Sequence, residues 1–386
     1  MQNTDFNVNE RRKSISEIQG IPLFNEKMSF YYDETGNCRK FSLKSDGTVN
    51  SVDAINHDFI LGGVAFKDDF RQDSIDELYK ELHLQASQKE LKYKRIHNRS
   101  GSFLETLGNH KITLLLDWLL DNPIYIHYSV LNNFYYALVD IVDSLFSTHK
   151  DVVASMDKQL KSSLYQFSKE HQDEVLSLLA KYHYPNIQKE ESRAFCMEWS
   201  DLIQCYNDDS TMEGFYLEMF RQALKYAGNQ KELTFLYDNE PEKLIDEYYL
   251  LYLERCVLFP DSYHVFDEES VVQSRINEVN LIYNGNLLNN YEFMNSEKSK
   301  YLQISDVFVG LLGSLFYYLD NLTKKDVELI FDGKHRTQIK NIDKIGTLIN
   351  RSNTLSPFFI KNSNDIQLIR EREDKISFLS NEQDLQ

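Results

Sequence analysis

Acidic side chains at predicted strand ends and in one apolar helix are the residues of this sequence that could do chemistry. Asp33 ends the first predicted strand, Asp267 ends a late strand, and Asp306 lies near the start of a helix that is otherwise almost uncharged. A carboxylate in such a helix must face solvent, a partner or a metal ion. Hard divalent cations need several converging oxygen ligands, so these three residues are candidates for a cation site.

Each of these acidic residues also has a structural explanation, and the residues alone leave both explanations open. An Asp at a strand end commonly forms a turn or caps a helix, and a helix dipole favours an anion such as Asp306 in the first turn. Glu268 and Glu269, directly before a predicted helix, are ordinary N-terminal charges. Gln303, Asp306 and Gly310 are spaced i, i+3 and i+7 and share one helix face. Gly310 is expected to let that face approach the sheet closely.

A local reversal of charge lies between Lys89 and Lys111, where six basic residues accompany two acidic ones. The whole chain has 42 Lys and Arg against 60 Asp and Glu, a net charge of −18. That balance excludes a protein that coats nucleic acid or an anionic membrane through overall charge. The segment is either a solvated loop or a rim that contacts phosphate beside the carboxylates. Glu90 within it suits a metal ligand at a groove edge. The candidate nucleic-acid contacts are Lys92, Lys94, Arg95 and Arg99.

The elements that must position these residues are predicted from periodicity. The 386 residues are 42% hydrophobic and 13% aromatic, with only 14 Gly and 6 Pro, which favours a large core and many helices. Strands are predicted at 28–33, 39–43, 58–66, 124–130 and 261–267, the first three as an antiparallel meander. Helices are predicted at 74–84, 103–120, 132–146, 270–283 and from 301 onward. We therefore predict an α/β fold with a mixed β-sheet of about five strands flanked by helices.

The order of these elements divides the chain into five parts. Residues 1–27 are polar and are expected to form a flexible arm, and 28–150 and 257–320 form the two halves of the α/β domain. Residues 151–256 show helical periodicity without a convincing strand, which predicts a large α-helical insertion. Its helices are expected at about 153–168, 173–182, 193–206, 211–226 and 241–257. Residues 321–386 are expected to form helices near 324–332 and 336–349 and then a polar tail.

Cysteine usage and hydropathy predict a cytoplasmic protein outside the membrane. The four cysteines include no CxxC pair and no His at zinc-finger spacing, so neither a disulfide scaffold nor a structural zinc site is expected. The first residues lack the apolar core of a signal peptide. The longest apolar run, 307–319, has the length of a buried core helix rather than a membrane span. His127 and His264, within predicted strands, are expected to be packing residues.

Several short segments, taken in order, resemble a prokaryotic family known as domain of unknown function 3800. The match spans roughly residues 28 to 320 and leaves 151–256 outside the family pattern. Ser305 stands where the family usually has alanine, and the short segment Asn295-Ser-Glu-Lys-Ser299 also fits. The segments are Tyr31-Tyr-Asp-Glu-Thr-Gly36, Phe59-Ile-Leu-Gly-Gly-Val64, Glu90-Leu-Lys92, Val265-Phe-Asp-Glu268 and Gln303-Ile-Ser-Asp306.

The resemblance implies a divergent ribonuclease H-like fold and two-metal phosphoryl transfer with Mg²⁺ or Mn²⁺. It implies that Lys92 faces the phosphate, that nucleic acid is the substrate, and that the protein acts in anti-phage defence. The implied metal ligands and catalytic carboxylates are Asp33, Glu90, Asp267 and Asp306. The secondary candidates are Glu34, Glu268 and Gln303.

Two other functions fit the same residues. The first is a catalytically silent scaffold or sensor that binds a partner protein of a defence system through the helical insertion. The acidic balance and the 24 Tyr and 24 Phe support it, because aromatic side chains are common at protein interfaces. The second is a metal-dependent hydrolase of nucleotides or other small phosphoesters.

Overall fold

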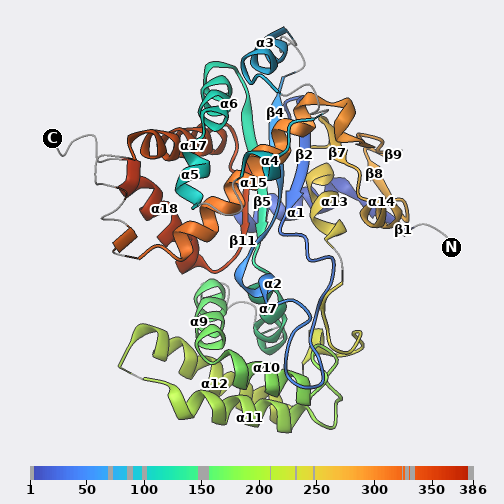
Figure 1. Ribbon diagram of the computed structural model, residues 1–386. Coiled ribbons are helices and arrows are strands. Elements are labelled where there is room, and N and C mark those ends of the chain that lie inside the picture. The colour runs from blue at the N-terminus through green and yellow to red at the C-terminus, as the bar shows by residue number, and fades with distance from the viewer. Residues whose placement is uncertain are drawn as a thin grey trace.

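The protein is a mixed α/β structure in which helices flank a central sheet and a separate helical lobe lies beside it (Figure 1). The computed structural model describes residues 4–67, 73–84, 90–97, 102–146, 156–208, 210–230, 233–246, 248–323, 325–326, 330 and 335–380.

The central sheet has six strands in the order β10-β7-β2-β4-β5-β11. Only β4 runs against the others: it pairs antiparallel with β2 and β5, whereas β7, β10 and β11 add in parallel. The expected mixed sheet flanked by helices is confirmed. The strands are β2 (Ser29–Thr35), β4 (Phe59–Phe66), β5 (Tyr125–Leu131), β7 (Tyr263–Asp267), β10 (Tyr291–Met294) and β11 (Ile360–Ser363).

Strand β4 lies at the centre of the sheet because all eight of its residues are apolar or glycine and all are buried. One face of the sheet packs on α15 (Lys300–Asp320), which contacts both β2 and β4. At Gly63, with φ of 154°, a side chain would collide with the Ser305 Oγ. Glycine at this position therefore allows α15 to lie directly on the sheet.

Two hydrophobic cores cover the two faces of the sheet. The core around α15 also contains side chains of the helices that surround it. The core on the opposite face includes Phe30, Tyr32 and Phe266 with α13, and it continues into the helical lobe. The surrounding helices are α3 (Asp73–Glu81), α4 (Tyr93–Ile96), α5 (Phe103–Leu107), α6 (His110–Asp121), α17 (Arg336–Leu355) and α18 (Ile366–Ser380), and α13 spans Tyr249–Leu258.

Within the described residues, α15 is the one helix long and apolar enough to cross a membrane. Of its most apolar window, 72% is buried inside the protein. This burial is typical of a core helix, as the sequence predicted for the apolar run at 307–319. The four cysteines are free: Cys196 and Cys256 are buried, Cys38 is partly buried and Cys205 is exposed.

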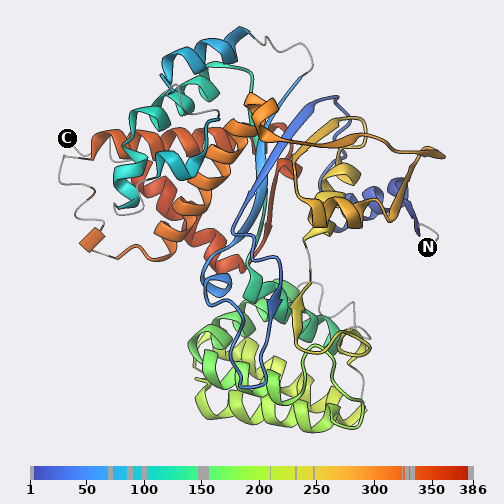
Figure 2. The same cartoon turned by 45° about the vertical axis from the view of Figure 1, so that its right-hand side comes forward.

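The helical lobe forms the lower part of Figure 2. A short sheet of β3 (Phe41–Ser42) and β6 (Lys243–Ile245) joins chain segments two hundred residues apart within it. The lobe helices are α7 (Asn133–Phe146), α9 (Asp157–Glu170), α10 (Gln172–Lys181), α11 (Ser192–Tyr206) and α12 (Met212–Gln230), with α2 (Asp53–Asn56) nearby.

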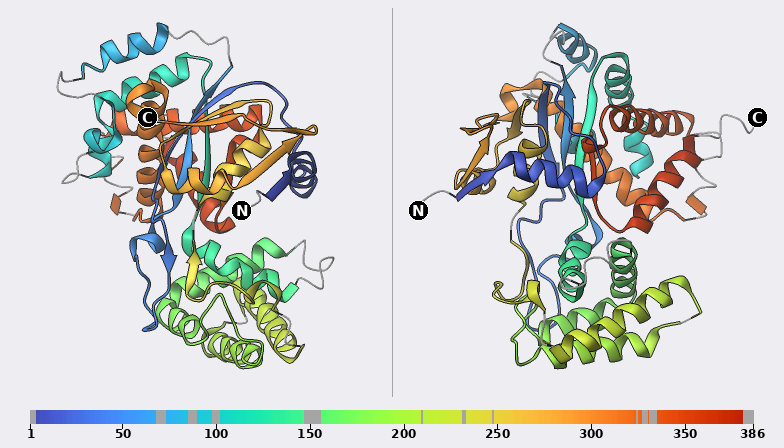
Figure 3. Two further views of the ribbon diagram at one scale, coloured as in Figure 1. Left: turned by 90° about the vertical axis from the view of Figure 1, so that its right-hand side faces the viewer. Right: turned by 180° about the vertical axis from the view of Figure 1, so that it is seen from behind.

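The expected flexible arm at 1–27 is wrong for residues 4–19. Strand β1 (Thr4–Asn7) pairs in parallel with β8 (Val279–Tyr283), and α1 (Val8–Gln19) follows it on the side of the molecule away from the C-terminal helices (Figure 3). Arg12 is buried and donates to the carbonyl oxygen of Leu258 at 3.2 Å. The buried side chains of α1 are Val8, Arg12 and Ile15. Because one of these three is an arginine, the sequence of this segment lacks a clear apolar stripe.

Several predicted elements differ in extent or partner. The segment 39–43 forms β3 in the small sheet, so the meander is β2-β4-β5 instead. The predicted helix 103–120 is broken at Gly108 and Asn109, because Asn109 caps α6. The predicted helix 270–283 is α14 (Ser270–Ile276) followed by β8 and its hairpin partner β9 (Asn286–Leu287), and 241–257 contains β6 before α13.

The predicted polar tail after residue 349 is also wrong. Helix α17 continues to Leu355, and β11 and α18 follow. Asp365 accepts hydrogen bonds from the first backbone N–H groups of α18, which is why this polar stretch is helical. Most of the helix predicted at 324–332, and residues 381–386, lie outside the described residues.

Candidate functional site

Two of the predicted acidic residues meet at the carboxyl ends of neighbouring strands. Strands β2 and β7 are parallel, and Tyr32 pairs with Phe266 in their register. Asp33 and Asp267 are the next residues on each strand. Because side chains alternate along a strand, both point away from the core around Tyr32 and toward the face that carries α15.

Helix α15 supplies the third carboxylate and also fixes the segment that contains Glu90 and Lys92. Asp306 Oδ2 accepts the backbone N–H of Tyr93 at 2.9 Å, and Gln303 Oε1 accepts that of Leu91 at 2.9 Å. A side chain at Gly310 would collide with the Tyr93 ring. The shared face of α15 therefore holds residues 90–93.

The expected role of Gly310 against the sheet is thus wrong. Ser305 of α15 does contact the sheet: its hydroxyl donates to the Tyr31 carbonyl oxygen at 3.1 Å and accepts from the Val64 N–H at 3.3 Å. Ser305 therefore stabilises the helix against β2 and β4.

Lys92 lies among the carboxylates. Its Nζ is 3.6 Å from Asp267 Oδ2 and 3.9 Å from Asp33 Oδ2, and its side chain is only 15% exposed. Burial lowers the pKa of Lys92, but the surrounding carboxylates, first of all Asp33, raise it more. The lysine stays protonated and is the cation that offsets the acidic cluster within the described part of the chain.

Glu90 joins the cluster through Ser296, a residue that the sequence reasoning did not single out. The Ser296 N–H donates to Asp267 Oδ1 at 3.0 Å, and its hydroxyl donates to Glu90 Oε2 at 3.4 Å. Ser296 begins a short 3₁₀ helix after β10 and is almost fully buried. In the sequence, the fit of residues 295–299 to the family pattern was the feature that could have indicated Ser296 as a site residue.

The surroundings of Asp33 disfavour the charged form of its carboxyl group. Its Oδ1 accepts the Glu34 N–H at 2.7 Å, whereas its Oδ2 is buried without a hydrogen bond. Burial raises the pKa of Asp33 well above its ordinary value, and the charge of Asp306 adds to this effect while Lys92 opposes it. Burial also raises the pKa of Asp306.

The donor set fits a hard divalent cation, because it consists of carboxylate oxygens and includes an orphaned buried one. Within the described ranges, no three acidic, His or Cys side chains already lie at the spacing of a metal site. A cation held by Asp33, Glu90, Asp267 and Asp306 would therefore require these side chains to move closer together.

The secondary candidates lie around the cluster in other roles. Glu34 points to the opposite face of β2, where it accepts from the Tyr252 hydroxyl at 3.1 Å, and burial raises its pKa to about 7. Glu268 is exposed and accepts from the Asn295 amide at 3.1 Å. Gln303 also donates to the Ser296 carbonyl oxygen at 2.9 Å, so it positions the backbone around the cluster.

The predicted basic rim is described in part. Lys94 and Arg95 lie exposed on α4, which begins directly after Lys92, and Arg95 Nη1 donates to the Glu90 carbonyl oxygen at 3.3 Å. Arg99 lies outside the described residues. The described part of the rim therefore presents two accessible positive charges beside the carboxylates.

Fold and site together define a mixed α/β protein with a lysine-bridged carboxylate cluster at the carboxyl edge of its sheet. No model of a known protein family matches this chain, and comparisons with curated proteins and with solved structures found no match.

Proposed function

We propose that this protein is a metal-dependent phosphodiester hydrolase with a ribonuclease H-like fold that cleaves nucleic acid. The observation that carries the proposal is the convergence of Asp33, Asp267 and Asp306 around Lys92, with a buried Asp33 oxygen that lacks a hydrogen bond. The strand order gives further support. Strands β2, β4 and β5 are successive and antiparallel, and β7 and β10 extend the sheet in parallel beside β2, which supports a ribonuclease H-like sheet.

In this proposal the carboxylates of Asp33, Glu90, Asp267 and Asp306 hold Mg²⁺ or Mn²⁺. Such ions, when bound as a pair, activate a water and stabilise the leaving oxygen of a phosphodiester. Lys92 pairs with Asp33 and Asp267. Cations that neutralise these carboxylates would leave the Lys92 ammonium available to contact a phosphate oxygen.

The exposed cations Lys94 and Arg95 beside the cluster would suit an extended anionic substrate. A cleft of about 910 Å³ begins at Thr35, two residues after Asp33, and is lined at the C-terminal end of α15 by residues between Gly313 and Asn321. The Tyr93 hydroxyl donates to Ser314 Oγ at 2.7 Å, so the segment that holds Lys92 also borders this cleft. Lys94 and Arg95 would offset the repulsion between the phosphate backbone and an acidic protein.

The test is cleavage of single- and double-stranded DNA and RNA with Mn²⁺ or Mg²⁺ present. Asp33→Asn and Asp306→Asn are expected to abolish metal-dependent cleavage and keep the circular dichroism spectrum of the wild type. Glu268→Gln, an exposed neighbour outside the cluster, is the matched control and should cleave normally. If both Asn variants cut like the wild type, the proposed site is wrong.

The second candidate is a catalytically silent scaffold that binds a partner protein through the helical lobe. Exposed apolar side chains favour it: Met212, Phe215 and Tyr226 lie along one side of α12, and Met197 and Phe235 are also exposed in the lobe. Calorimetric titration with Mn²⁺ separates the two. Micromolar binding that Asp33→Asn abolishes supports the hydrolase, and no binding at millimolar metal supports the scaffold.

A cytoplasmic role in defence against phage is the physiological part of the proposal. It rests on the family resemblance. Phage should then form fewer plaques on a host that expresses the wild-type protein than on a host that expresses Asp33→Asn. Equal plaque numbers with a panel of phages would contradict the defence role and leave the chemistry to the cleavage assay.

A further inference from the structure

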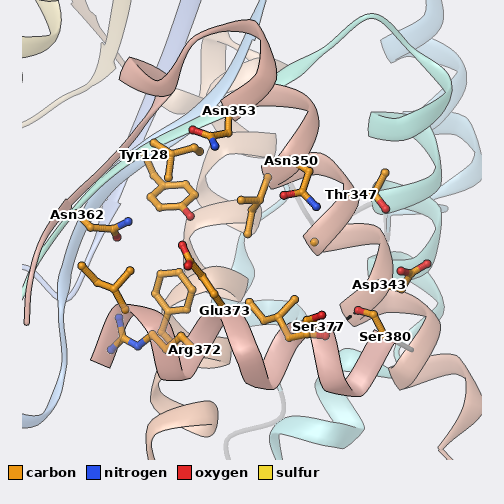
Figure 4. Close-up of a pocket in the computed structure, with 16 residues that line it drawn as sticks. Tyr128, Asp343, Thr347, Asn350, Asn353, Asn362, Arg372, Glu373, Ser377 and Ser380 are labelled. Carbon is orange, nitrogen blue, oxygen red and sulfur yellow. Dashed lines mark hydrogen bonds between the residues drawn. The ribbon is translucent and has the colours of Figure 1, made fainter. Parts of the chain in front are cut away.

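A second cleft, of about 650 Å³, lies between α17, α18 and the β5–β11 edge of the sheet (Figure 4). It shares no residue with the carboxylate cluster. We propose that it binds a small organic di- or polyamine, with one ammonium group near Glu373 and a second near Asp343.

The charge of the cleft selects a cation. Glu373 on α18 and Asp343 on α17 line it, and neither has an ion pair or side-chain hydrogen bond to a described residue. Arg372 is the one cation among the described lining residues. It is 5% exposed and is bound to Asp58 at 2.6 Å and to Asp320 at 2.7 Å. The cleft therefore presents two unpaired negative charges, which disfavour an anionic ligand.

A mostly buried tyrosine side chain that lacks a hydrogen-bond partner among the described residues is the independent sign of a ligand. Tyr128 on β5 is 3% exposed, and its hydroxyl makes no hydrogen bond to a described residue. In Figure 4 the ring points its hydroxyl into the cleft, toward the Glu373 carboxylate. Burial and then the Glu373 charge raise the pKa of Tyr128, so the phenol stays neutral and can accept from an ammonium N–H. A bound amine would give this hydroxyl the hydrogen-bond partner that it lacks among the described residues.

The rest of the lining suits the body of an amine with several N–H groups. Asn350, Asn353 and Asn362 have amide side chains without a hydrogen bond to a described residue, and their oxygens can accept from further ammonium groups. Ile349 and Ile376 supply apolar contact for methylene groups between the amines. The volume lies within the range of small-molecule sites.

The position of the two acids indicates more than one amine. Asp343 and Glu373 come from different helices, and Figure 4 shows them on separate sides of the cleft, with Thr347 near the former and Tyr128 near the latter. A molecule with amines at both ends would satisfy both carboxylates. A monoamine would leave one carboxylate unpaired.

Spermidine is the probe, titrated into the full chain by calorimetry at physiological ionic strength. The wild type should bind one equivalent, and Glu373→Gln and Tyr128→Phe should each weaken binding about tenfold or more, because each removes a charged or hydrogen-bonded contact. Glu371→Gln removes the same charge from an exposed position on the same helix outside the cleft. It should bind as the wild type does, and so should Asp33→Asn, since this site is independent of the proposed hydrolase.

Three results would overturn the proposal. The first is no binding at 1 mM spermidine. The second is equal weakening by Glu371→Gln and Glu373→Gln, which would mean general attraction to an acidic protein. The third is binding of a neutral nucleoside in place of spermidine, because the cleft would then recognise a base and not an amine.

Discussion

Neutralising Asp33 is expected to stabilise the metal-free protein and to remove its response to metal. In Asp33→Asn the shape of the side chain is kept, and the buried charge that faces Asp306 and Asp267 is lost. Lys92 keeps its pair with Asp267 at 3.6 Å. The new amide can donate to the neighbouring carboxylates, whereas Asp33 Oδ2 has no hydrogen bond. Relief of strain at functional sites commonly adds about 1–2 kcal/mol.

The size of the effect follows from chain length. For 386 residues the entropy of unfolding is about 0.8 kcal/mol per kelvin, so a gain of about 1.5 kcal/mol raises Tm by about 2 °C. Mn²⁺ at a hundred times its Kd stabilises the wild type by about 2.7 kcal/mol, or about 3 °C. In EDTA, Asp33→Asn should therefore unfold at a higher Tm than the wild type. Addition of Mn²⁺ should raise the Tm of the wild type and leave the Tm of Asp33→Asn unchanged.

Differential scanning calorimetry in EDTA and in Mn²⁺ is the assay, and Asp58→Asn is the matched control. Asp58 is also a buried carboxylate, but it pairs with Arg372 at 2.6 Å and accepts from the Asn132 amide at 3.0 Å. Its loss should cost about 3 kcal/mol and leave the Mn²⁺ response intact. A lower Tm for Asp33→Asn in EDTA, or an unchanged Mn²⁺ shift, would refute the assignment of Asp33 to a strained metal site.

Three further outcomes follow from single contacts. Gly63→Ala should lower the free energy of unfolding by about 3 kcal/mol in urea, because its Cβ would collide with Ser305; a neutral result would mean that α15 does not lie on β4 as closely as observed. His264 is fully buried, and burial lowers its pKa to about 3. Between pH 6.5 and pH 3 the imidazole is therefore protonated in the unfolded state and neutral in the folded state. Stability should therefore fall with pH from 6.5 toward 3, by about 1.4 kcal/mol per unit more in the wild type than in His264→Gln, and parallel pH curves would contradict this. Ser296→Ala loses the contact to Glu90 and keeps the N–H bond to Asp267, so Mn²⁺ affinity should fall about tenfold with Tm nearly unchanged; calorimetry showing wild-type affinity would exclude a role for the hydroxyl.

The sequence predicted the elements whose own residues carry a strong pattern. Strand β4 is a continuous apolar run, and Asp33 and Asp267 stand where apolar strands end. Strands β10 and β11 are four residues each and half-buried, so no periodicity marks them. The pairing of Phe41 with Ile245 depends on tertiary contacts that local propensity does not encode.

The charged residues of the candidate site could be predicted from the sequence. The backbone groups that bind their carboxylates could not. Asp306 and Lys92 are visible as anomalies of charge in their surroundings. The N–H groups of Tyr93 and Ser296 bind the carboxylates of Asp306 and Asp267, and every residue except proline carries such a group. The arginine buried in α1 was missed for a related reason, since two of its partners are backbone carbonyl oxygens and the third is the neutral side chain of Asn25.

The most direct test of the proposed site is the anomalous diffraction of a crystal soaked in Mn²⁺. The proposal predicts manganese peaks in contact with carboxylate oxygens of Asp33 and Asp306, with the Lys92 ammonium displaced from Asp33. A soaked crystal without manganese at these carboxylates, and with Lys92 still between Asp33 and Asp267, would contradict it.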